Sequence, residues 1–121
     1  MHTQLKEGLE NWLDSIPPLA GVLACGMRMP DRSTVNRSFD DGFPDASLDN
    51  AWRCVADTLQ VLRSQRLPGR RLRWTYEHHL LQCAVRSDGA FLGIITTSQR
   101  EELDEIGIEE TLVGFTSLSV I

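Results

Sequence analysis

The residues of this chain that could do chemistry are its cysteines, its histidines and its clustered acids. The three cysteines, Cys25, Cys54 and Cys83, are an odd number at wide spacing and form no CxxC pair. That pattern argues against a disulfide framework and against a zinc site. Free cysteine packs as a small hydrophobe, and no neighbour in sequence is a base that would activate one of these thiols. We therefore expect reduced, buried thiols.

A histidine pair and an acidic loop are the other candidates for metal binding. His78 and His79 are adjacent, so on a strand they would point to opposite faces and could share a metal only on a turn. Asp40 and Asp41 open an acidic stretch that lacks the alternating ligands and the closing Glu of an EF-hand loop. We expect a solvated turn and a solvated loop, with no metal and no cofactor.

Motifs of enzyme active sites are also missing. The chain has no nucleophile elbow, no glycine-rich phosphate loop and no HExxH sequence. Paired acids such as Glu101-Glu102 and Glu109-Glu110 are typical of solvated helix or loop faces. The sequence therefore predicts a protein that is not an enzyme and has no catalytic residues.

Length and charge narrow the class of protein. A chain of 121 residues predicts one domain, 1–121. Its net charge of −5, from 17 acids against 12 bases, disfavours a nucleic-acid or anionic-membrane partner. The start of the chain lacks a secretory signal and no apolar run is long enough to span a bilayer, so we expect a cytoplasmic protein. A local basic cluster is interpreted as a solvated helix end running into a polar strand face; it comprises Arg63, Arg66, Arg70, Arg71 and Arg73.

Three short strands in succession within residues 71–97 organise the chain. In the first, Leu72, Trp74 and Tyr76 alternate with polar residues, which predicts one buried face and one wet face. Asp88-Gly89 supplies the positive φ that a tight hairpin needs between the second and third strands. The third strand is apolar on both faces, so we place it in the middle of a sheet. The strands are predicted at Arg71–Glu77, Leu80–Arg86 and Phe91–Thr97.

Helical periodicity and turn residues predict the remaining elements. Pro17-Pro18 ends the first helix, Pro68-Gly69 ends the second, and Ser98 with Glu101 forms a capping box for the third. Thr3 can cap the first helix, and the apolar end Val120-Ile121 can dock on the sheet. Helices are predicted over Thr3–Ser15, over Ser47–Leu67 and from Ser98 onward, with strands over Leu19–Met29 and, at a polar edge, Thr34–Phe39.

The predicted order is helix, two strands, helix, three strands, helix (αββαβββα). Helices must then cover both faces of one five-stranded antiparallel sheet, which makes the fold class α+β with a helix–sheet–helix sandwich. This order resembles the Roadblock/dynein light chain family, which has a profilin-like fold. The features that carry the resemblance are the stretch Ile16–Ala24, where a helix ends near proline and a glycine-containing strand follows, the helix Ser47–Leu67 and the strand run ending at Phe91–Thr96. The Met29–Ser33 turn differs from the short Asp-Gly turn common in that family.

The resemblance implies a non-enzymatic homodimer that pairs sheets edge to edge through Arg71–Glu77, beside the second helix. Such dimers regulate or scaffold Ras-like small GTPases, or act as adaptors in motor and signalling complexes. Trp74 and Tyr76 on a candidate edge strand supply a physical reason for pairing, because an uncovered edge invites a partner strand. Aromatic and arginine anchors are common in interface hot spots. The predicted interface residues are Trp52, Arg53, Leu59, Arg63, Trp74 and Tyr76.

Two other functions fit the same residues. An acidic, dimeric secretion chaperone has a similar size, charge and mixture of elements. A profilin-like or PAS-like sensor domain would hold a small molecule between sheet and helix, in an apolar cavity beside Gly93 or Cys83.

Overall fold

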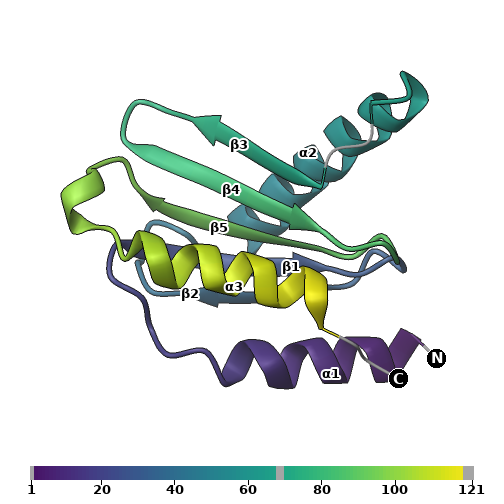
Figure 1. The fold of residues 1–121 in the computed structure, drawn as a ribbon, viewed down its shortest axis with the longest axis horizontal. Helices are drawn as coiled ribbons and strands as arrows, with labels where there is room; N and C mark the ends of the chain where they lie inside the picture. The colour runs from purple at the N-terminus through teal and green to yellow at the C-terminus, as the bar shows by residue number, and fades with distance from the viewer. Residues whose placement is uncertain (1, 68–69, 119–121) are drawn as a thin grey trace.

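The computed structural model describes residues 2–67 and 70–118, with the side chains of residues 2–4 excepted. Its elements follow the predicted order, and the α+β helix–sheet–helix sandwich is confirmed (Figure 1). The helices are α1 (His2–Asp14), α2 (Asp45–Ser64) and α3 (Glu105–Ser117), with a short 3-10 helix η1 (Arg100–Glu102). The strands are β1 (Val22–Arg28), β2 (Thr34–Ser38), β3 (Arg71–Thr75), β4 (His79–Val85) and β5 (Phe91–Thr97). None of the described helices combines the length with the apolar character that crossing a bilayer requires.

The sheet is antiparallel throughout, in the order β2-β1-β5-β4-β3. The predicted central position of the doubly apolar strand is confirmed, because β5 lies in the middle and all its residues from Phe91 to Thr96 are buried. The predicted edge position of the polar strand β2 is also confirmed. Strand β3 forms the opposite edge of the sheet and pairs with β4 alone among the described strands.

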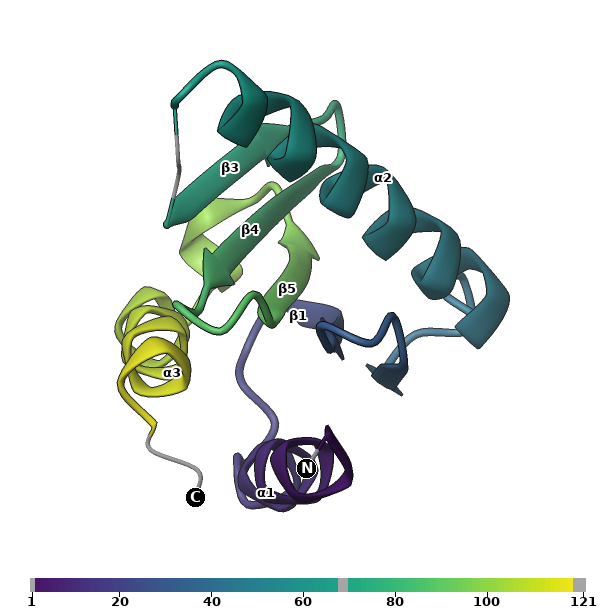
Figure 2. The same ribbon diagram turned by 90° about the vertical axis from the view of Figure 1, so that its right-hand side faces the viewer.

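Helices cover both faces of the sheet, with α2 on one face and α1 and α3 on the other (Figure 2). On the first face, Leu48, Trp52, Val55 and Leu59 of α2 pack against β4 and β5. On the second face, Leu9 of α1 and residues of α3 pack against β1 and β5. The chain thus builds two apolar cores on the two sides of a single pleated layer.

The centre of the α2 face is built around Trp52, which is fully buried. Gly26 of β1 and Gly93 of β5 are directly paired across neighbouring strands, and both lie beneath the indole ring. A Cβ atom at either glycine would overlap the ring, so only glycine lets the helix approach this closely. The indole Nε1 donates a hydrogen bond of 2.7 Å to Oδ1 of Asn36 on β2, which satisfies its buried polar atom.

The predicted capping box at Ser98 and Glu101 is wrong. The last helix begins at Glu105, and the carboxylate of Asp104 accepts a hydrogen bond of 2.9 Å from the Gly107 N–H. After β5 the chain forms the 3-10 helix η1, and the Asp104 N–H then donates to the Ala20 carbonyl at 3.0 Å. That tertiary contact delays the helix, so that Gly107 lies in its first turn.

The other differences concern element ends. Helix α2 begins at Asp45 rather than Ser47, after Pro44, which makes no side-chain cap. The first strand begins at Val22 rather than Leu19, because Gly21 takes a left-handed φ of +83°. Strand β3 ends at Thr75 rather than at the predicted Glu77. Helix α2 ends at Ser64 rather than Leu67, and Arg66, just beyond it, takes a positive φ of 60°. Pro68-Gly69, the cap by the Thr3 side chain and the docking of Val120-Ile121 lie outside the described residues.

Candidate interaction surface

The backbone of β3 presents hydrogen-bonding groups to the outside of the sheet. Tyr76 N–H donates to the His79 carbonyl, and Val85 N–H donates to the Arg70 carbonyl. In this antiparallel register the even-numbered residues of the β3 segment direct their backbone toward β4. The backbone groups of Arg71, Arg73 and Thr75 therefore point away from β4, and no strand pairs with them in the part of the chain that the structure describes.

The side chains of β3 divide between the two faces of the sheet. Leu72 and Trp74 are half-buried and pack at the border of the core beneath α2. Arg71, Arg73 and Thr75 are exposed on the face that carries α3. The edge strand is consequently apolar on one face and basic on the other. The half-buried pair leaves part of its apolar surface open at the rim of the sheet.

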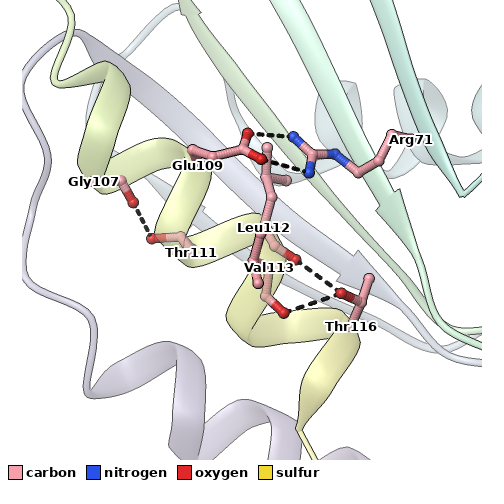
Figure 3. Close-up of polar contacts among 7 residues, drawn as sticks. All are labelled: Arg71, Gly107, Glu109, Thr111, Leu112, Val113 and Thr116. Carbon is pink, nitrogen blue, oxygen red and sulfur yellow. Dashed lines mark hydrogen bonds and ion pairs between the residues drawn. The ribbon is translucent and has the colours of Figure 1, made fainter.

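Arg71 ties the edge strand to α3. Its Nη1 and Nη2 donate hydrogen bonds of 3.0 and 2.6 Å to the two carboxylate oxygens of Glu109 (Figure 3). This bidentate bond lowers the pKa of the Glu109 carboxyl and raises the pKa of the Arg71 guanidinium. Both side chains are about half exposed, so the pair orients Arg71 more than it stabilises the fold.

A shallow groove of about 450 Å³ runs between β3 and α3. Its floor includes Arg73 and, directly opposite on β4, Gln82. Leu103 and Ile108 contribute apolar side chains to the lining of the groove, and Glu105 contributes a carboxylate. Among the residues with described side chains, none hydrogen-bonds or ion-pairs with the side chain of Arg73 or Gln82. The groove therefore contains donors that are available to a partner or an anion.

Two of the six predicted interface residues lie in the core. Trp52 is 0% exposed and Leu59 is 5% exposed, both in the cluster beneath α2. Their aromatic and apolar character reflects packing against the sheet. Because both side chains are buried, they do not form part of the surface that would contact a partner. Trp74 joins the same cluster from the edge strand, so the structure does bring these three residues together.

The remaining three predicted residues are exposed but scattered. Tyr76 lies just beyond the end of β3 and is 54% exposed. Arg53 lies on the outer side of α2, close enough to Asp49 to act on its charge. Arg63 lines a separate hollow with Pro30 and Gly89 at one end of the sheet. Of the three, Tyr76 is the one that adjoins the β3 edge.

Sequence reasoning missed two surface features. Gln82 stands opposite Arg73, and nothing in the sequence shows this pairing. Val61 is 60% exposed on α2, although its apolar character gives no sign of exposure. The alternation of Leu72 with Arg73 is the one sequence pattern that indicates an apolar face and a basic face on strand β3.

The thiols differ in exposure. Burial raises the pKa of the Cys25 thiol to about 11 and that of Cys83 to about 12. Both match the expected reduced, buried cysteines. The expectation is wrong for Cys54, which is exposed on the outer side of α2. All three cysteines are free of disulfide bonds.

The histidine pair divides between a turn and a strand. His78 is exposed in the turn, as predicted, whereas His79 begins β4 and packs edge-on against Phe43 with ring centroids 5.4 Å apart. Asp40 and Asp41 lie in an exposed loop, as predicted. Within residues 2–67 and 70–118, no group of three or more His, Cys, Asp or Glu side chains is arranged to hold a metal ion.

The cavity expected for a small-molecule sensor is not found at the predicted place. The space beside Gly93 is filled by the indole of Trp52, and the Cys83 side chain is fully buried beneath the same helix. A hollow of about 200 Å³ does lie on the opposite face, beneath the end of α1, lined by Ile16, Val22 and Ile94 among others. It is smaller than typical ligand sites of roughly 300–1,000 Å³.

The described residues form an α+β sandwich whose sheet has β2 and β3 as its two edge strands. No protein-family model matches the sequence, and no curated protein matches it. Among solved structures, the chain is similar to the crystal structure of MglC from Myxococcus xanthus, at 18% sequence identity and a TM-score of 0.46. The similarity covers 94% of this chain and 98% of MglC.

Proposed function

We propose that this chain is a non-enzymatic interaction module that forms a homodimer by pairing β3 with β3 of a second copy. The observation that carries the proposal is the outward-facing backbone of Arg71, Arg73 and Thr75, flanked by apolar Leu72 and Trp74. Adding a strand there would complete these hydrogen bonds and cover apolar surface at once.

The two edges of the sheet are not equally suited to pairing. On β2, the side chains of Thr34 and Asn36 are both engaged with the carboxylate of Asp49, at 2.8 Å each. That edge is polar, and polar edges discourage pairing between chains. The β3 edge instead carries Leu72 and Trp74, so we assign the dimer contact to β3.

The geometry of β3 restricts the register of such a dimer. Antiparallel copies related by a two-fold axis must pair the outward-facing residues with one another. The register that pairs the whole strand sets Arg73 opposite the partner subunit's Arg73. On the other face it sets Leu72 opposite the partner subunit's Trp74, twice, and cross-strand pairs of this kind stabilise sheets.

A Ras-like small GTPase is the partner we propose to test first. The αββαβββα order that resembles the Roadblock family is present in the structure. In that family the dimer acts as a regulator or a scaffold for such GTPases, so the whole domain would work as a cytoplasmic adaptor. No catalytic step is proposed for the chain itself.

A proline substitution at the edge tests the dimer. Thr75→Pro removes an outward-facing N–H and leaves the β3–β4 hydrogen bonds in place, so the monomer should fold while the dimer weakens. Ser38→Pro is the matched control, because it removes an outward-facing N–H from the β2 edge. Sedimentation equilibrium should show dimers for the wild-type protein and for Ser38→Pro, and monomers for Thr75→Pro. A wild-type protein that is monomeric at micromolar concentration would refute the proposal.

The GTPase role needs a separate measurement. Wild-type protein and Thr75→Pro should be titrated against Ras-like GTPases from the same genome, each loaded with GDP or with a non-hydrolysable GTP analogue. Binding by the wild-type protein and its loss with Thr75→Pro would support a GTPase-linked dimer. A dimer that binds none of them in either state would remain an interaction module with a different partner.

A further inference from the structure

The proposed dimer brings like charges together on the α3 face of its seam. In the full-length register, Arg73 lies directly opposite the partner subunit's Arg73, and each Arg73 is also opposite Gln82 of its own chain. A row of four side chains therefore crosses the seam, with the two Arg73 guanidinium groups in the middle and a Gln82 amide at each end. Like charges directly opposite one another destabilise paired strands, so this row needs a counter-charge.

The acids near the seam do not supply that charge in the described structure. Glu109 is engaged with Arg71 through both carboxylate oxygens. Glu105 lines the groove but forms no ion pair with Arg73 among the described residues. The two Arg73 side chains would therefore meet with their donors unpaired, at the floor of a trough formed by the two grooves.

We propose that the seam binds one dianionic oxyanion of the phosphate class between the two Arg73 side chains, and that this anion tightens the dimer. The inference rests on the proposed β3–β3 dimer. The planar guanidinium group matches a phosphate oxygen pair, and the two Gln82 amides can donate to the remaining oxygens. The site exists only in the dimer, because each chain contributes half of it. Dimerisation and anion binding are consequently linked, and each strengthens the other.

The proposal is tested by measuring the dimer dissociation constant in sodium chloride and in sodium phosphate at equal ionic strength. Phosphate should lower the dissociation constant of the wild-type dimer. Arg73→Gln should dimerise more tightly than wild type in chloride, by up to about fivefold from relief of the like-charge pair. It should also lose its response to phosphate. The matched control Arg32→Gln removes an exposed arginine from the turn between β1 and β2, away from the β3 edge, and should behave as wild type.

The possible outcomes separate the two proposals. A wild-type dimer that responds equally to chloride and phosphate, with Arg73→Gln no tighter, overturns the anion site and leaves the dimer intact. A monomer under every condition overturns the dimer.

A phosphoserine-containing peptide provides a second test. A dimer dissociation constant that is lowered by inorganic phosphate indicates a free anion as the ligand. A dissociation constant that is lowered by the peptide alone indicates a phosphoryl group carried by a protein. Glu105→Gln should enlarge the phosphate response, since it removes a negative charge from the lining of the groove.

Discussion

The indole of Trp52 occupies the space that a side chain at Gly93 would fill. Gly93 belongs to the central strand and Trp52 to the helix that covers it, so this contact sets how closely α2 approaches the sheet. Because Leu72 and Trp74 pack at the border of the same core, the contact also helps to hold the edge strand in position.

Gly93→Ala should destabilise the fold. A Cβ at this position would overlap a rigid, fully buried ring, and overpacking of this kind costs about 1–3 kcal/mol. Urea unfolding followed by circular dichroism measures the change. Gly42→Ala is the matched control, because the nearest atom to its Cβ would be 3.6 Å away in an exposed loop. Equal midpoints for Gly93→Ala and wild type would show that the ring can move aside.

Asn36→Ala should also destabilise the fold, for a different reason. It leaves the buried Trp52 N–H without its acceptor, and an unsatisfied buried donor costs about 1–3 kcal/mol. The midpoint of urea unfolding should fall with an unchanged m value. Asn50→Ala, which alters an exposed asparagine on α2, should stay within about 0.5 kcal/mol of wild type. If both variants unfold at the wild-type midpoint, the indole hydrogen bond contributes nothing measurable.

Asp49 should titrate at an unusually low pH. The side chains of Asn36 and Thr34 donate to its carboxylate and lower its pKa below the usual range. The stability from these bonds is present above the unfolded-state pKa of about 3.9 and is lost as the pH falls through the lower folded-state pKa. Carbon-detected NMR titration should therefore find a higher Asp49 pKa in Asn36→Ala than in the wild-type protein, and an unchanged pKa in Asn50→Ala. A normal Asp49 pKa in the wild-type protein would contradict these contacts.

Thiol reagents should distinguish Cys54 from the other two cysteines. Cys54 is exposed, whereas burial raises the pKa of Cys25 to about 11 and that of Cys83 to about 12. At a pH of about 8 a chromogenic disulfide should modify Cys54 rapidly, and it should reach Cys25 and Cys83 only in denaturant. Cys54→Ser should abolish the rapid phase. A rapid phase that persists in this variant would show that one of the buried thiols is accessible.

Most of the architecture could be predicted from local patterns. The alternation in Arg71–Glu77 predicted a strand with one buried and one wet face, and the doubly apolar Phe91–Ile95 predicted a central strand, because the spacing of apolar residues shows whether one face or both are buried. The element ends were less predictable. The last helix begins at Glu105 because Asp104 bonds to Ala20, and no local signal in Ser98–Glu101 reveals that contact.

The candidate interaction surface was likewise predictable only in part. The sandwich and the exposed basic residues of β3 could be predicted from the sequence alone, because they depend on residue type and spacing. Only the tertiary structure shows that Trp52 and Leu59 are buried, that Arg63 lies away from the edge, and that Gln82 stands opposite Arg73. An aromatic or an arginine has the same local pattern whether it faces a core or a partner. Its environment is decided by strands and helices distant in sequence, and only their packing determines which surface remains open.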